Sequence, residues 1–159
     1  MPETPEHLSN RLAEESHRTL QFFRALNPDQ WNRKVYDDGA GWTVCHVLAH
    51  FSITEAGIRA LMQNILIGGQ GLPQDFDLNI YNEREVGDLG EVVPDEMLVR
   101  FQAERQATID WLNGLSAEDF LKTGRHPWLG ISPLEEMIQL LYRHNQIHQR
   151  DIRKRLAEG

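Results

Sequence analysis

Apolar residues recur every three or four positions in four long stretches of the chain, and polar residues fill the positions between them. This spacing places the apolar side chains on one face of an α-helix and predicts four amphipathic helices. We expect them at residues 6–26, 43–67, 94–113 and 132–157. No segment alternates apolar and polar residues as a strand does, so we expect no strands. The pattern predicts an all-α fold.

Capping residues set the expected ends of three of these helices. Thr43 is a candidate N-cap for the second helix, and Pro94 suits the first position of the third. The fourth helix is expected to begin at Ser132, with Pro133 in its first position and Glu135 closing a capping box.

Two connections are long enough to hold more than a turn. Residues 28–41 are rich in Asn, Asp and Gly, which predicts a loop. Residues 68–93 form the longest connection, and residues 77–86 within it have the pattern of a short helix. A four-helix domain with one long link usually has a crossover there. This link either roofs a ligand pocket or simply covers the bundle.

Composition limits the classes of function. The chain has 159 residues, of which 40% are hydrophobic, and this fits a single domain spanning residues 1–159. The formal net charge of −8 argues against a nucleic-acid partner, because no basic patch is available to neutralise phosphates. The single cysteine excludes an internal disulfide, and no apolar run approaches the roughly 18 residues of a bilayer span. We therefore expect a cytoplasmic protein with no membrane partner.

Two histidine pairs are the strongest candidates for chemistry. His144 and His148 lie four apart on the apolar stripe of the last helix, so both rings project from the same face toward the core. Such a pair is either a satisfied structural pair or two ligands of one metal ion, and buried imidazoles need partners for their ring nitrogens. His46 and His50 repeat the spacing on the second helix. If the two helices are neighbours, His50, His144 and His148 can converge on one cation.

Two other side chains need an interpretation. Cys45 lies about 140° around the helix from His50, so we expect it to face away from the histidines as a small buried residue. Arg105 falls on the apolar stripe of the third helix. A guanidinium there either reaches the edge of the core or is paired inside, where it could hold an anionic group of a substrate.

Five short motifs together resemble the DinB/YfiT-like superfamily of metal-binding four-helix bundles. In chain order they cover residues 42–50, 79–84, 101–105, 126–130 and 144–152. The resemblance implies an up-down-down-up bundle with a long crossover between the second and third helices. It also implies that a divalent ion is held by His50, His144 and His148. His46 falls where relatives often carry another polar residue, so we expect it to support a ligand or to be exposed.

The resemblance implies several activities. Three neutral imidazoles favour Zn, Ni or Fe over Mg or Ca. The family includes bacillithiol and mycothiol S-transferases and maleylpyruvate isomerase, and other relatives are described as metal-dependent hydrolases. Our first hypothesis is an enzyme that activates a low-molecular-weight thiol cosubstrate for transfer to an electrophilic small molecule, with Arg105, Asn82 and His126 orienting the substrate. The alternatives are hydrolysis by metal-activated water and a non-catalytic stress protein that binds metal or ligand. A homodimer and a monomer both remain open.

Overall fold

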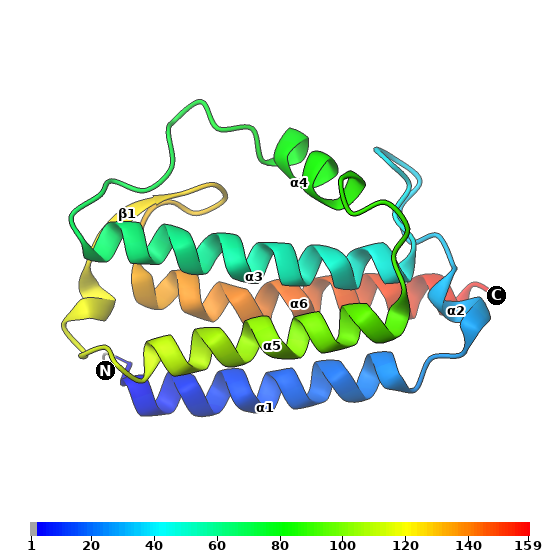
Figure 1. Cartoon of the computed structure of the whole chain (residues 1–159), viewed down its shortest axis with the longest axis horizontal. Helices are drawn as coiled ribbons and strands as arrows, with labels where there is room; N and C mark the ends of the chain where they lie inside the picture. Colours follow the sequence, from blue (N-terminus) through cyan, green and yellow to red (C-terminus); the bar gives the residue numbers. More distant parts are fainter. Residues whose placement is uncertain (1–2) are drawn as a thin grey trace.

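The computed structural model describes residues 3–159, and four long helices build most of it (Figure 1). They are α1 (Pro5–Arg24), α3 (Val44–Leu66), α5 (Pro94–Leu112) and α6 (Leu134–Ala157). The helix α1 packs against α5 and α6, and α3 packs against the same two helices, so together the four form a four-helix bundle. The all-α prediction is confirmed for the bundle, to which one small hairpin is added.

Side-chain hydrogen bonds fix the directions of the helices. Gln146 and Gln149 of α6 bond Glu15 and Thr19 of α1, so these two helices run in parallel. Arg59 of α3 bonds residues 104 and 108 of α5, while Arg105 bonds residue 55, so α3 and α5 are also parallel. The colours in Figure 1 show that α3 and α5 run opposite to α1 and α6. The order is up-down-down-up.

The start of α3 agrees with its predicted cap, whereas the start of α6 does not. Thr43 caps α3, and His46 completes the capping box, because its Nδ1 accepts the backbone N–H of Thr43 at 3.1 Å. The helix α6 begins at Leu134 and has no side-chain cap. Ser132 instead belongs to a strand, because the segment before the helix is extended and pairs with residues 123–126. Its predicted role as an N-cap was wrong.

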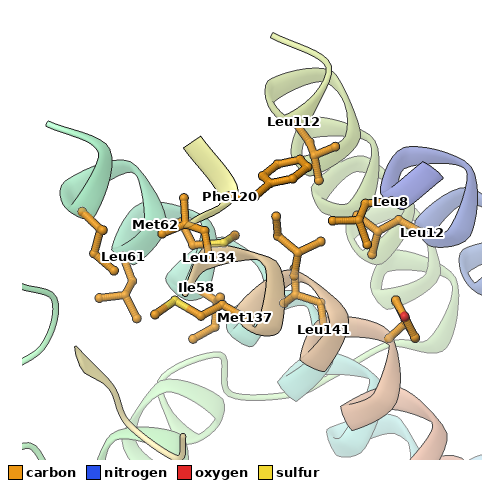
Figure 2. Close-up of a cluster of buried hydrophobic side chains, with 13 residues drawn as sticks. Leu8, Leu12, Ile58, Leu61, Met62, Leu112, Phe120, Leu134, Met137 and Leu141 are labelled. Atoms are coloured by element: carbon orange, nitrogen blue, oxygen red, sulfur yellow. The ribbon is translucent and has the colours of Figure 1, made fainter. Parts of the chain in front are cut away.

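The interior of the bundle holds two apolar clusters. Figure 2 shows the first, in which side chains of α1, α3, α5, the turn at Phe120 and α6 meet. Its members are Leu8, Leu12, Ile58, Leu61, Met62, Ile65, Leu112, Phe120, Leu134, Met137, Ile138, Leu141 and Tyr142. The second cluster lies toward the other end of the bundle and includes Leu20, Phe23, Trp31, Cys45, Phe51, Phe101 and Ile152. The histidines of α3 and α6 fall between the two.

Smaller elements cover one side of the bundle. The crossover contains α4 (Leu78–Gly87), and a hairpin of β1 (Thr123–His126) and β2 (Gly130–Pro133) precedes α6. Both lie on the α3 side in Figure 1. The short η1 (Asp119–Leu121) leads into the hairpin, and α2 (Pro28–Trp31) adds one helical turn to the predicted loop.

The crossover is joined to the hairpin at Gly71. The φ of Gly71 is +88°, and a Cβ there would lie 2.5 Å from the carbonyl oxygen of Arg125, so only glycine fits without a shift of the backbone. Across residues 3–159, none of the helices combines the length and the hydropathy that a bilayer span requires.

Candidate metal centre

Three histidine rings meet between α3 and α6. The Nε2 of His144 lies 3.0 Å from the Nε2 of His50 and 3.0 Å from the Nε2 of His148. All three ligand atoms lie within 4.8 Å of one another. The pair on α6 is one helical turn apart, and His50 faces it from the antiparallel α3. The structure thus brings together the three residues that the sequence proposed as ligands.

Hydrogen bonds to the opposite ring nitrogens orient two of the rings. The Nδ1 of His148 lies 2.6 Å from the hydroxyl of Tyr36, and this hydroxyl donates to Asp151 at 2.7 Å. Burial and Asp151 raise the pKa of Tyr36, so the hydroxyl keeps its proton and accepts the Nδ1–H of His148. His50 makes a longer contact of 3.4 Å from Nδ1 to Thr54. A proton on Nδ1 leaves the lone pair of Nε2 facing the centre.

The rings are kept neutral by their surroundings. Burial lowers the pKa of His50 to about 3 and of His148 to about 4, and it lowers the pKa of His144 well below its usual value. Trp42 lies against His50 with ring centroids 4.9 Å apart, and Phe51 lies against both histidines of α6. At neutral pH all three imidazoles are in the neutral form, which can bind a metal through the nitrogen that carries no proton.

The arrangement fits a divalent transition metal. If each ring presents the lone pair of its Nε2, the three lone pairs repel one another in an apolar surrounding, and a cation between them removes this repulsion. Tetrahedral zinc, with Zn–N distances of about 2.0–2.1 Å, holds its nitrogen ligands about 3.3 Å apart. The two separations that involve His144, both 3.0 Å, are close to this value. An all-imidazole donor set favours Zn, Ni or Fe over Mg or Ca.

Two connected spaces meet at the histidines. The larger is a groove of about 700 Å³, which is lined by Tyr36, Trp42, Asn79, Glu83 and the three histidines, among others. The smaller is an inner pocket of about 60 Å³ with mostly apolar walls. His50, His144, Leu78, Asn82 and Trp128 line both spaces. The crossover helix α4 and the hairpin therefore wall the site.

The structure places two of the three proposed substrate-orienting residues at this site. Asn82 of α4 lines both spaces. His126 of β1 lines the inner pocket and is 5% exposed. Its Nδ1 accepts the backbone N–H groups of Trp128 and Leu129 at 3.0 and 3.1 Å. Burial lowers the pKa of His126 to about 4.

Arg105 is elsewhere, which corrects its expected role. Its guanidinium forms two hydrogen bonds to the carboxylate of Glu55, at 3.0 and 3.1 Å, and a third to the carbonyl of Leu12. Both side chains of the ion pair are 1% exposed, and Arg105 lines neither space of the site. Its charge is already paired inside the bundle, so it cannot hold an anionic group of a substrate.

His46 and Cys45 lie outside the metal cluster. His46 caps α3, which is neither of the roles expected for it. Cys45 is packed in the second apolar cluster, where burial raises the pKa of its thiol to about 11. A thiol with this pKa is a poor internal nucleophile at neutral pH.

Sequence spacing missed the support of His148. Asp151 stands three residues after it on the same helix, and this spacing places the two on one face. Tyr36 comes from the loop after α2, more than a hundred residues earlier, and no sequence period connects the two. Trp128 lines both spaces of the site, and the sequence indicated it only as part of a family motif.

Comparisons with known proteins agree with this fold. YfiT from Bacillus subtilis, described as "a probable metal-dependent hydrolase with an unusual four-helix bundle topology", matches with a TM-score of 0.77 and 19% identity over 97% of this chain and 86% of that chain. A mycothiol-dependent maleylpyruvate isomerase matches with a TM-score of 0.74 and 15% identity, covering 93% of this chain and 60% of that one. The colibactin self-resistance protein ClbS, solved in complex with double-stranded DNA, has a TM-score of 0.71 and 15% identity, over 97% and 98% of the two chains.

The TM-scores show a shared fold, and at such low identities the activity has to be argued from the site. No curated protein matches the chain. The family model described as the DinB superfamily matches residues 11–152, which include all of α3 and α5, most of α1 and α6, and the three histidines. The chain belongs to the DinB superfamily.

Proposed function

We propose that this protein is a divalent-metal-dependent enzyme that transfers a low-molecular-weight thiol to an electrophilic small molecule. The observation that carries the proposal is the meeting of two unlike spaces at one histidine cluster. A groove of about 700 Å³ suits a polar cosubstrate, and an apolar pocket of about 60 Å³ suits a compact second reactant. A hydrolase needs only one organic substrate beside water, whereas a transferase needs two.

The residues of the chain have separate roles in this proposal. His50, His144 and His148 would hold the metal, and the Tyr36–Asp151 pair would keep the ring of His148 in its binding orientation. When bound, such a metal acts as a Lewis acid and lowers the pKa of a thiol or water at its open position. Trp42 and Phe51 exclude water from the histidine side of the site, and this strengthens electrostatic interactions there. Asn82 lies where the two reactants would meet.

Hydrolysis by metal-activated water is the second candidate. It is favoured by the likeness to YfiT and by Glu83, whose carboxylate lines the groove and is a candidate base for a water molecule. The dependence of the mycothiol isomerase on a thiol favours the first candidate. The acidic net charge of −8 favours small molecules over nucleic acid as substrates.

The experiment is to incubate metal-loaded protein with a panel of small electrophiles, with and without low-molecular-weight thiols, and to measure product by mass spectrometry. We expect turnover that requires both metal and thiol and that is lost in His144→Ala. His17→Ala, which removes an exposed histidine of α1, is the matched control and should keep full activity. Turnover without thiol would support the hydrolase instead. A metal-replete protein that turns over nothing would support a non-catalytic binding protein.

A further inference from the structure

His126 differs from His148 in the ring nitrogen that carries its proton. A backbone N–H group can only donate, so the Nδ1 that receives the N–H groups of Trp128 and Leu129 must be an unprotonated acceptor. The proton of this neutral ring is therefore on Nε2. This is the reverse of His148, in which Nδ1 carries the proton.

The Nε2–H of His126 is available to a ligand. Within residues 3–159 it has no hydrogen-bond partner, and it is not enclosed away from solvent. The ring lines the inner pocket together with His50 and His144. The turn between the two strands fixes the ring, because both donors to Nδ1 lie in that turn. A fixed N–H donor at a small cavity is suited to one acceptor atom of a bound molecule.

The rest of the pocket limits that molecule. None of the residues that line it carries a full charge, because its histidines are neutral and its other members are apolar or are Thr54 and Asn82. Its volume of about 60 Å³ is smaller than the roughly 150 Å³ of a cavity that admits benzene, so the pocket has room for a short alkyl group.

We propose that the inner pocket binds an uncharged electrophile with a short apolar chain and one acceptor oxygen, of the epoxide or carbonyl type, and that the Nε2–H of His126 donates to this oxygen. The reaction part of this inference rests on the proposed function. In the opening of an epoxide, the sulfur of the thiol forms a bond to carbon and the C–O bond breaks. The electron pair of that bond moves to the oxygen that faces His126, and the proton lost by the thiol ends on this oxygen. The addition needs no other co-reactant.

The first test measures the proton position and binding without any turnover. Protein labelled with ¹⁵N-histidine and loaded with Zn²⁺ is observed by long-range ¹H–¹⁵N NMR, and the His126 signals are assigned with His126→Gln. We expect the Nε2–H form for His126 and a selective shift of its Nε2 signals when 2-butanone, an unreactive ketone, is added. Leu140→Trp fills the pocket and should abolish the shift, whereas Ile67→Trp, at a position 86% exposed, should not. A proton on Nδ1, or a ketone response that survives Leu140→Trp, would overturn the proposal.

The second test separates this inference from the proposed function. With a thiol present, kcat/KM is measured for 1,2-epoxybutane and for 1-bromobutane, which has the same chain and no oxygen. We expect His126→Leu to lose on the order of tenfold or more with the epoxide and little with the bromide, since one donor to a developing oxyanion is worth at least that much. His126→Gln, which keeps an N–H donor, should recover part of the loss. Equal losses on both substrates would contradict the role of His126, whereas an inactive wild type that passes the NMR test would contradict only the thiol transfer.

Discussion

The assignment of metal ligands depends on single protons at the ring nitrogens. His148 presents Nε2 to the centre because the hydroxyl oxygen of Tyr36 accepts its Nδ1–H. That oxygen is free to accept because the O–H of Tyr36 donates to Asp151. His126 is held in the opposite form by two backbone donors. The contacts of these two rings therefore make His148 a candidate metal ligand and His126 a hydrogen-bond donor.

Tyr36→Phe tests the first part of this scheme. The variant removes the acceptor of the His148 proton and leaves the aromatic ring, so we expect the fold to persist and the metal affinity to fall about 10–100-fold. A competition titration with a chelator measures the affinity, and circular dichroism checks the fold. Tyr142→Phe, at a buried tyrosine in the first apolar cluster, is the control and should bind metal as the wild type does. An unchanged affinity in Tyr36→Phe would show that the hydroxyl is irrelevant to the site.

At the level of elements, the helices followed from the sequence and their irregular neighbours did not. Apolar spacing predicted α1, α3, α5 and α6 to within a few residues, because burial of one face is the main force that stabilises each helix. The hairpin was missed because β1 (Thr123–His126) and β2 (Gly130–Pro133) are too short for an alternating pattern to show, and the bridge from Gly71 to Arg125 joins segments far apart in the sequence. The strand then displaced Ser132 from its expected cap.

The candidate site was also predictable only in part, because some of its contacts join segments that are far apart in the sequence. The spacing of histidines on two helices identified three residues that the structure brings together, since helix geometry is regular. The sequence placed Arg105 on a core face and could not reveal that Glu55, on another helix, already pairs with it. Contacts between distant segments, such as Tyr36 with His148, have no local signal.

The buried pair of Arg105 and Glu55 joins α3 to α5 and supplies a prediction about stability. Arg105→Met leaves a buried carboxylate without its partner, so we expect a loss of about 3–5 kcal/mol in the free energy of unfolding. The double variant Glu55→Leu/Arg105→Met removes both charges and should recover most of this loss. Denaturant unfolding followed by circular dichroism measures both. A single variant as stable as the wild type would mean that the pair contributes nothing to the bundle.

On the scale of the whole molecule, the bundle has its own apolar core on both sides of the histidines, so it does not need a metal to fold. A bound metal adds stability by mass action, because it binds the folded chain and not the unfolded one. We expect the thermal midpoint to rise on addition of Zn²⁺ or Ni²⁺ and to return after chelation, with helical content unchanged. Differential scanning calorimetry and circular dichroism check this, and loss of the helices on chelation would be inconsistent with it.

The metal-free protein should lose stability in mild acid. The pKa values of His50 and His148 are lowered to about 3 and about 4 in the folded chain, whereas an unfolded histidine has a pKa near 6.5. Below about pH 6.5 the unfolded chain therefore binds more protons than the folded chain, and the free energy of unfolding falls as the pH falls toward 4. Denaturant unfolding at pH 7.5, 6 and 5 measures the slope. His144→Phe, which removes one buried imidazole, should have a shallower dependence, and a wild type equally stable at pH 7.5 and 5 would refute the argument.

The most direct test of the account is the metal content of the protein purified without a histidine tag, measured by elemental analysis for the wild type, His144→Ala and His17→Ala. Convergence of three imidazoles predicts about one transition-metal ion per chain in the wild type and in His17→Ala, and nearly none in His144→Ala. Equal metal content in all three proteins, or a wild type that binds no divalent transition metal when supplied with it, would contradict the account.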